Sequence, residues 1–183
     1  MSISAKPQIG TWNVDPAHST AEFKVRHMMI SNVKGHFSGI TGSLALNEAD
    51  VTRSAVDTSI DAASLNTREP QRDAHLKSTD FFDVEKFPKL FFKSTRVTRD
   101  TQGALQVTGD LTIHDVTRSV VFTVESLSEP AKDPWGNTRV GLSATTKINR
   151  KDFGLTWNAA LETGGVLVGD EVTVSLDVQF IKT

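Results

Sequence analysis

Five histidines are the side chains of this sequence best suited to catalysis or metal binding: His18, His27, His36, His75 and His114. No two have the close spacing that places two metal ligands on one helix or one strand. If Ser31-Asn32 forms a two-residue hairpin turn, His27 lies opposite His36, and antiparallel pairing brings the two side chains within metal-bridging reach. The alternative is that one of them is buried and hydrogen-bonded while the other is exposed.

A second group of charged side chains lies in residues 66–92, the one long interruption of a sequence that otherwise has a strand-like period. Three basic residues stand among two acidic ones in this segment: Arg68, Glu69, Arg72, Asp73 and Lys77. They either form local salt bridges on a solvated helix face, or some of the cations, or His75, lie at a cavity mouth and hold a polar or anionic headgroup. The sequence leaves both interpretations open.

Several other functional classes lack their sequence signals. There is no nucleophile elbow, no zinc-protease motif, no phosphate-binding loop and no dinucleotide fingerprint. The absence of cysteine excludes disulfides, zinc–thiolate sites and a thiol nucleophile. A net charge of -2 over 183 residues gives no basic field that would attract nucleic acid. We therefore expect a binding protein that is not an enzyme, needs no cofactor and has no nucleic-acid partner.

The elements around segment 66–92 follow from its capping residues and prolines. Thr67 is the expected helix N-cap, with Pro70 in the first turn, which predicts a short helix from Pro70 to about Lys77. A second turn, residues 80–86, directs its aromatic side chains inward and ends at Pro88.

The rest of the chain predicts antiparallel strands. Residues 20–29 and 172–180 alternate between apolar and polar side chains, which is typical of strands with one buried face. Residues 34–47 are expected to form one long strand, in which three glycines and a change of parity indicate a bend. About eight strands joined by short turns predict an all-β, eight-stranded antiparallel barrel with a short helical insert near one opening, as one domain over residues 1–183. Small inward-facing residues predict an unfilled apolar interior.

The first ten residues contain no apolar leader segment, and no apolar run is long enough to cross a bilayer. We therefore expect a soluble cytoplasmic protein without stable membrane insertion.

Seven short motifs occur in order along nearly the whole chain. They are Trp12-x-x-Asp15-Pro16-x-His18-Ser19, Phe23-x-Val25-x-His27, Arg72-Asp73-x-His75-Leu76, residues 80–88 (DFFDVEKFP), Phe92-x-Ser94, Gly109-x-Leu111-Thr112-Ile113-His114 and Asn149-Arg150-x-Asp152-Phe153-Gly154. On these motifs the sequence resembles the YceI family of lipocalin-like polyisoprenoid-binding proteins.

The resemblance implies a lipocalin-like barrel with a helix beside its opening. It also implies a long apolar cavity for the tail of an isoprenoid lipid, such as a prenyl phosphate or an isoprenoid quinone, and a homodimer. The family has no established catalytic residues, and the expected role is transport, storage or stress response.

The inward positions and the resemblance together predict twelve ligand-binding residues. Nine lie on the inner face: Phe23, Val25, Ile60, Phe81, Phe92, Leu111, Ile113, Phe122 and Leu142. Three lie near the mouth: His27, Arg72 and His75. Two alternative functions stay open, namely a small metal- or histidine-dependent enzyme using His27, His36 or His75, and a stress-related interaction module with a filled barrel.

Overall fold

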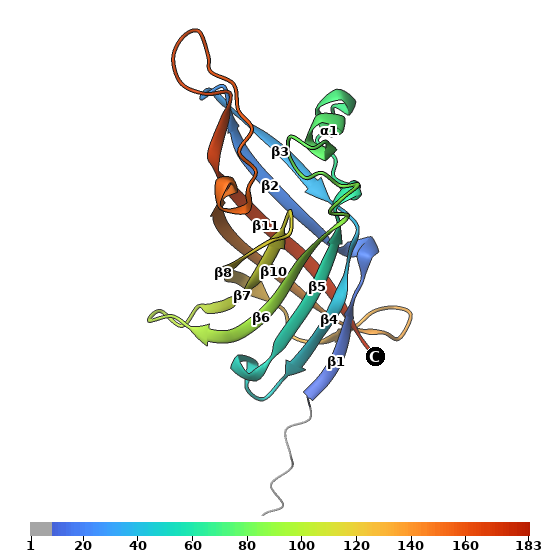
Figure 1. Cartoon of the computed structure of the whole chain (residues 1–183). Helices are drawn as coiled ribbons and strands as arrows, with labels where there is room; N and C mark the ends of the chain where they lie inside the picture. Colours follow the sequence, from blue (N-terminus) through green and yellow to red (C-terminus); the bar gives the residue numbers. More distant parts are fainter. Residues whose placement is uncertain (1–8) are drawn as a thin grey trace, which may run out of the picture.

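The computed structural model describes residues 9–183, and most of its regular structure is β-strand (Figure 1). The strands are β1 (Ile9–Val14), β2 (Thr20–His27), β3 (Ser31–Phe37), β4 (Ile40–Asn47), β5 (Ala55–Asp61), β6 (Lys89–Arg99), β7 (Leu105–Ile113), β8 (Val116–Leu127), β9 (Ala131–Lys132), β10 (Thr138–Asn149) and β11 (Val168–Lys182). Within the described range the one α-helix is α1 (Pro70–Lys77). Four short 3-10 helices are η1 (Pro16–His18), η2 (Val51–Arg53), η3 (Ala62–Ser64) and η4 (Arg150–Phe153). The sequence-based expectation that the chain begins without an apolar leader rests mainly on residues 1–8, which lie outside the described part.

Eight of the strands close into an antiparallel barrel, in the order β1-β4-β5-β6-β7-β8-β10-β11 and back to β1. The long β10–β11 ladder runs from Arg139 opposite Ile181 to Asn149 opposite Glu171. The remaining strands extend the ring at its edges, because β2 and β3 continue outward from β11 and β9 adds to β10. The predicted eight-stranded antiparallel barrel with one helical insert is therefore confirmed.

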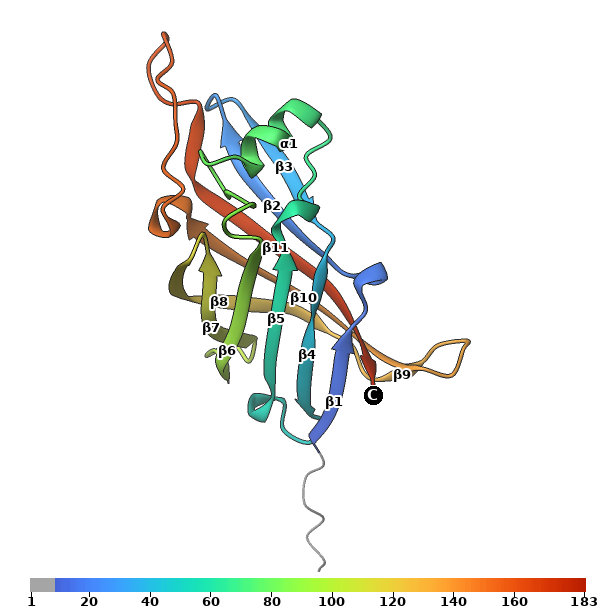
Figure 2. The ribbon, with the colours of Figure 1, turned by 45° about the vertical axis from the view of Figure 1, so that its right-hand side comes forward.

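The barrel is closed at one end and open at the other because β1 and β2 share one edge of β11. β1 pairs with the last residues of β11, with Val14 opposite Phe180, whereas β2 pairs with the part of β11 from Val168 to Asp177, with Thr20 opposite Asp177. η1 separates the two strands. The hairpin β2–β3 thus rises beyond the closed ring, and α1 lies beside it at the open end (Figures 1 and 2).

The expectation of one strand over residues 34–47 is wrong, because the chain breaks at Ser38-Gly39. β4 continues alongside β5, but β3 leaves that edge and meets the following segment only through a bridge between His36 and Asn66. A Cβ on Gly39 would lie 2.8 Å from the Asp61 Cβ, so only glycine allows the chain to pass this close. The divergence of β3 from β5 leaves the side opening that segment 62–88, with α1, occupies.

The α1 helix has the expected bounds but a different cap. The Glu69 carboxylate accepts hydrogen bonds from the backbone N–H groups of Gln71 (3.1 Å) and Arg72 (2.6 Å), so Glu69 is the N-cap rather than Thr67. Thr67 is buried instead, where its hydroxyl donates to the Asp73 carboxylate at 2.5 Å. The cap is displaced because a buried hydroxyl finds a stronger partner in a carboxylate than in a helix N–H.

The turn after α1 fastens the helix to the barrel. The backbone N–H of Phe82 donates to the Leu76 carbonyl at 2.9 Å, and that of Val84 donates to the Lys77 carbonyl at 3.1 Å. The Phe82 ring packs edge-on against Phe37 of β3, with 5.5 Å between the ring centroids. These contacts satisfy the last carbonyls of the helix and fix its position at the open end.

The closed end of the barrel is tightly packed. Trp12, Val140 and Phe180 are at most 2% exposed there. Elsewhere in the barrel, Phe92 of β6 and Phe122 of β8 pack edge-on against each other, with ring centroids 5.2 Å apart. Because side chains fill the closed end, any internal space has to lie toward the open end.

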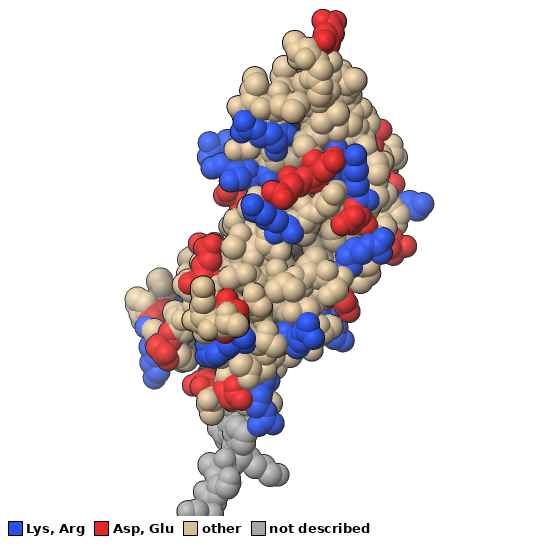
Figure 3. Space-filling model, turned by 90° about the vertical axis from the view of Figure 1, so that its left-hand side faces the viewer, with Lys and Arg blue, Asp and Glu red and all other residues tan. Residues whose placement is uncertain are grey.

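The outer surface carries mixed charges. Figure 3 shows basic and acidic side chains interspersed over the face that it displays. In residues 9–183, no helix has the length and apolar character needed to cross a bilayer.

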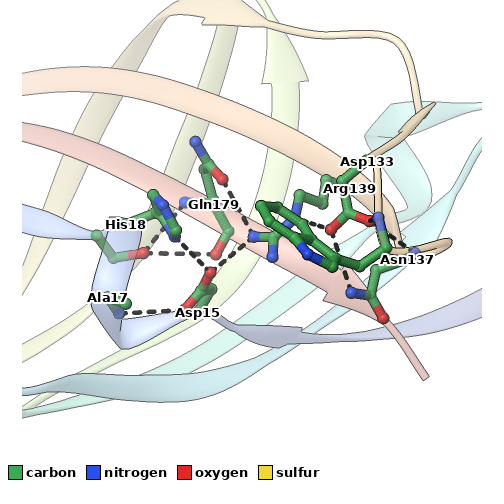
Figure 4. A network of polar contacts seen from close by, with 9 residues as sticks. Asp15, Ala17, His18, Asp133, Asn137, Arg139 and Gln179 are labelled. Carbon is green, nitrogen blue, oxygen red and sulfur yellow. Dashed lines mark hydrogen bonds and ion pairs between the residues drawn. The ribbon is translucent and has the colours of Figure 1, made fainter.

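A polar network holds the corner where β1 passes into β2 (Figure 4). Arg139 of β10 donates to Asp15 at 2.6 Å and to Asp133 at 2.7 Å, and His18 contacts the same Asp15 oxygen at 2.7 Å. The hydrogen bond from the Arg139 guanidinium is the largest cause of the lowered pKa of Asp15. It is also the largest cause of the lowered pKa of Asp133, which falls from 3.8 to about 2. The network connects η1, β10 and the 133–137 loop on the outside of the barrel.

Candidate ligand-binding site

An apolar cavity of about 410 Å³ lies at the open end of the barrel. Pockets that hold small molecules have volumes of roughly 300–1,000 Å³, so this cavity has a suitable size. Its polar lining residues are Glu22, Arg26, His27, Gln71, Arg72, His75 and Arg150, and the other lining residues are apolar.

Paired strands form one wall of the cavity. The inward residues of β2 stand opposite those of β11 in register, with Ala21 facing Leu176, Phe23 facing Val174 and Val25 facing Val172. All six line the cavity. The period-two pattern of both strands produces this wall, because every second side chain of a strand points to the same face.

The opposite wall comes from α1 and its following turn. Arg72, His75 and Leu76 lie at helical positions i, i+3 and i+4, so they share one face, and all three line the cavity. The Arg72 guanidinium donates to the Thr67 hydroxyl and to the Thr67 carbonyl, both at 2.8 Å. Two of its five N–H groups are thereby used, and the others are left for the cavity mouth or solvent.

An aromatic cluster joins α1 to the loop before β11. The His75 ring stands edge-on to Trp157, with centroids 4.6 Å apart, and edge-on to Phe81 at 5.2 Å. His75 Nε2 also contacts the Asp80 carboxylate at 2.8 Å. His75, Phe81 and Trp157 line the cavity and form a contact from the helix to the 155–167 loop.

Arg150 holds that loop in place from inside. It is only 4% exposed, and its guanidinium donates to the carbonyls of Leu155 (2.6 Å), Gly169 (2.8 Å), Trp157 (2.9 Å) and Val168 (3.3 Å). Burial lowers the pKa of Arg150, and the charge of the nearby Asp170 carboxylate acts in the opposite direction. Backbone carbonyls use most of the donors of this side chain, so its part in the cavity is to shape the wall.

Nine of the twelve predicted ligand-binding residues line this cavity: Phe23, Val25, His27, Ile60, Arg72, His75, Phe81, Leu111 and Ile113. Phe92, Phe122 and Leu142 are not among the residues that line it. Phe92 stands opposite the cavity-lining Leu111 and packs edge-on against Phe122, whereas Leu142 stands opposite the buried Val178.

The sequence reasoning missed the residues that follow β10, above all Arg150, Phe153, Leu155 and Trp157. The motif Asn149-Arg150-x-Asp152-Phe153-Gly154 was a usable signal, because an arginine between a strand and a loop is a good donor for several carbonyls. That signal does not reveal which carbonyls lie within reach.

The proposed cross-strand pair of His27 and His36 does not form. The hairpin turns at Met28–Ile30, so His27 lies opposite Ser31 and His36 lies opposite Glu22. His18 contacts Asp15, and His114 packs against Phe87 at 4.6 Å. Among residues 9–183, no three histidine, aspartate or glutamate side chains are grouped as metal ligands would be.

The closed ring, the helix beside its open end and the internal cavity define a lipocalin-like β-barrel. The YceI-like domain family matches residues 12–180, and the chain belongs to this family. The chain is 37% identical over 167 residues to a UPF0312 protein of Staphylococcus aureus, covering 91% of this chain and 94% of that protein.

Two solved structures share the fold. The crystal structure of the Campylobacter jejuni YCEI protein is 29% identical, with a TM-score of 0.70, and covers 87% of this chain and 91% of that one. A domain from Saccharophagus degradans, described as a polyisoprenoid binding domain implicated in plant cell wall breakdown, is 14% identical with a TM-score of 0.65. This second match covers 96% of this chain and all of that one (100%), and at this identity it supports the fold alone.

Proposed function

We propose that this protein binds an isoprenoid lipid, such as a prenyl phosphate or an isoprenoid quinone, with the tail in the barrel cavity and the headgroup at its mouth. The observation that supports this most is the cavity of about 410 Å³, whose paired-strand wall carries six apolar side chains that face one another across β2 and β11. A branched hydrocarbon tail offers only apolar surface, and each buried CH₂ contributes about 0.8 kcal/mol. The binding of polyisoprenoid described for the Saccharophagus degradans domain agrees with this ligand class.

The polar groups of α1 are suited to a headgroup. Gln71, the unused N–H groups of Arg72 and the His75 ring all border the cavity. Phosphate and quinone oxygens both accept hydrogen bonds from such donors, so the mouth suits either headgroup. Transport, storage and stress response are each compatible with reversible binding of this kind.

The two alternatives receive less support. The enzyme hypothesis relied on a His27–His36 pair that the hairpin register does not form. The filled-barrel hypothesis disagrees with the cavity. The absence of catalysis, the cytoplasmic location and the homodimer expected from the sequence remain predictions within this proposal.

Native mass spectrometry of the purified protein, incubated with geranylgeranyl phosphate or with a short-chain isoprenoid quinone, tests the proposal. We expect one lipid per chain, and binding at least about tenfold weaker in Leu111→Trp, because the indole would occupy the volume that the tail needs. The matched control is Val121→Trp, which adds the same ring at a position that is 42% exposed.

Failure of both lipids to bind would contradict the proposal. Equal affinity of Leu111→Trp and Val121→Trp would also contradict it, because a ligand outside the cavity would not respond to its volume. A thermal melt of each variant checks that the barrel is still folded.

A further inference from the structure

Two loops meet at the open end of the molecule and leave large apolar side chains in solvent. Met28, Met29 and Ile30 in the β2–β3 turn are 42%, 58% and 73% exposed, and Val166 before β11 is 41% exposed. The Met28 N–H donates to the Leu167 carbonyl at 2.7 Å, so the turn and the loop form one continuous surface. We refer to Met28, Met29, Ile30 and Val166 as the apolar tip.

The turn is unusual for an exposed hairpin. Met28 and Met29 have φ angles of 51° and 62°, in the left-handed region that glycine and asparagine adopt most easily. Fold stability and solubility would both favour small polar residues there. Two bulky apolar residues in this conformation, followed by the highly exposed Ile30, indicate contact with an apolar phase outside the protein.

The apolar tip stands at the rim of the cavity. His27 and Leu167, which directly adjoin it in the chain, both line the cavity, as does the next residue, Val168. Figures 1 and 2 show the turn and the long loop before β11 at the same end of the molecule, with α1 beside them. An apolar surface held against the tip would therefore lie close to the cavity mouth.

A group of cations lies behind the tip on the outer face of the same hairpin. Lys24 stands directly opposite Lys34. Arg26 follows Lys24 on that face and also borders the cavity, while the acidic Glu22 precedes Lys24, farther from the tip. Like charges in register destabilise a strand pair, so an external anion would relieve their repulsion. The sequence between Arg26 and Lys34 contains no acidic residue. We refer to Lys24, Arg26 and Lys34 as the basic collar.

We propose that the open end of the barrel docks reversibly on an anionic lipid bilayer. The apolar tip enters the interface and the basic collar lies against the headgroups, which is how peripheral proteins combine apolar and electrostatic attraction. A second copy of this chain fits less well, because a symmetric contact through the tips would bring two basic collars together. The purpose of docking rests on the proposed function, since an isoprenoid tail could then pass from the bilayer into the cavity without crossing water.

Flotation of the full chain with vesicles tests this proposal. We expect binding to vesicles of equal phosphatidylglycerol and phosphatidylcholine, and weaker binding to phosphatidylcholine alone. Ile30→Glu should lower the partition coefficient about tenfold or more, because an aliphatic side chain leaves the apolar phase and a carboxylate replaces it. Met29→Glu is the second variant and should act in the same direction.

The matched control is Trp135→Glu, which makes the same kind of change at an exposed aromatic residue (81% exposed) in the 133–137 loop beyond β9. It should bind vesicles like the unmodified protein. An Ile30→Glu variant that binds as well as Trp135→Glu would overturn the proposal. A tip variant that converts a dimer into a monomer in light scattering, with no change in vesicle binding, would also overturn it.

Lipid binding by Ile30→Glu, measured in solution by native mass spectrometry, separates this inference from the proposed function. Unchanged lipid binding with lost vesicle binding supports docking through the tip. An unmodified protein that takes up the lipid but ignores vesicles refutes docking and leaves the proposed function standing. Vesicle binding without lipid uptake supports docking and contradicts the proposed function.

Discussion

Replacing Arg150 with methionine should lower the free energy of unfolding by about 3 kcal/mol. The guanidinium connects η4 to the start of the 155–167 loop and to the start of β11 through four carbonyls at 2.6–3.3 Å. A hydrogen bond to a charged group contributes about 1.5–3 kcal/mol, so the three shortest bonds alone would contribute more than the expected loss of about 3 kcal/mol. Two effects reduce this sum: methionine removes the cost of burying a charge, and Trp157, Val168 and Gly169 are only half-buried residues, so water can replace part of the lost hydrogen bonding.

Urea unfolding followed by circular dichroism measures this loss directly, and a thermal melt should show a decrease of about 6–12 °C for a chain of this length. The control is Lys151→Met, which removes a neighbouring positive charge whose side chain is 49% exposed. This control should change stability by less than about 1 kcal/mol, as exposed ion pairs do.

Arg150→Lys keeps the charge but reaches fewer carbonyls, and it should fall between the methionine variant and the unmodified protein. If Arg150→Met costs no more than Lys151→Met, the guanidinium does not hold the loop, and the assignment of Arg150 as its anchor is refuted. The same result would also mean that Arg150 does not hold Trp157 against His75.

Acid should destabilise the protein as the pH falls from about 4 to about 2, because the pKa of Asp133 is lowered from 3.8 to about 2 and that of Asp15 is also lowered. The stability from these carboxylates is complete above their ordinary pKa and is lost as they are protonated. Arg139→Gln removes their main partner and should flatten melting temperature against pH in this window, so an unchanged slope would count against the network. Gly35→Ala should lower the free energy of unfolding in urea by about 1–3 kcal/mol, because the new Cβ would lie 2.3 Å from the Phe23 ring. Unchanged stability would mean that this ring moves aside freely. Glu69→Ala should cost about 1 kcal/mol by the same measurement, with a smaller loss for Glu69→Gln, and equal losses would argue against capping through the carboxyl oxygens.

The inward and outward faces of the strands could be read from the sequence. Phe23, Val25 and His27 were placed on one face by their alternation, and all three line the cavity. The bounds of α1 followed from Pro70 and from the end of the helical pattern near Lys77. These features are local, because a residue's neighbours in the chain determine which way a strand or a helix turns its side chains.

Pairing across strands was less predictable. A turn at Ser31-Asn32 would have placed His27 opposite His36, but the hairpin turns at Met28–Ile30 and the register differs. Such a displacement changes every cross-strand neighbour while the strand pattern itself stays the same. The metal-site hypothesis depended on register and was lost with it.

The sequence by itself determined that this chain forms an antiparallel barrel with a helical insert, and which side chains point inward. Only the tertiary structure decided how far along the barrel each inward residue lies. Phe92, Phe122 and Leu142 alternate as regularly as Phe23, yet they pack against other side chains and are not among the residues that line the cavity. Strand period specifies a face but not a height, because height depends on which strands pair and where, as when β1 and β2 divide one edge of β11. Arg150 and Trp157 reach the cavity for the same reason, since residues distant in the chain supply the carbonyls and rings that hold them there.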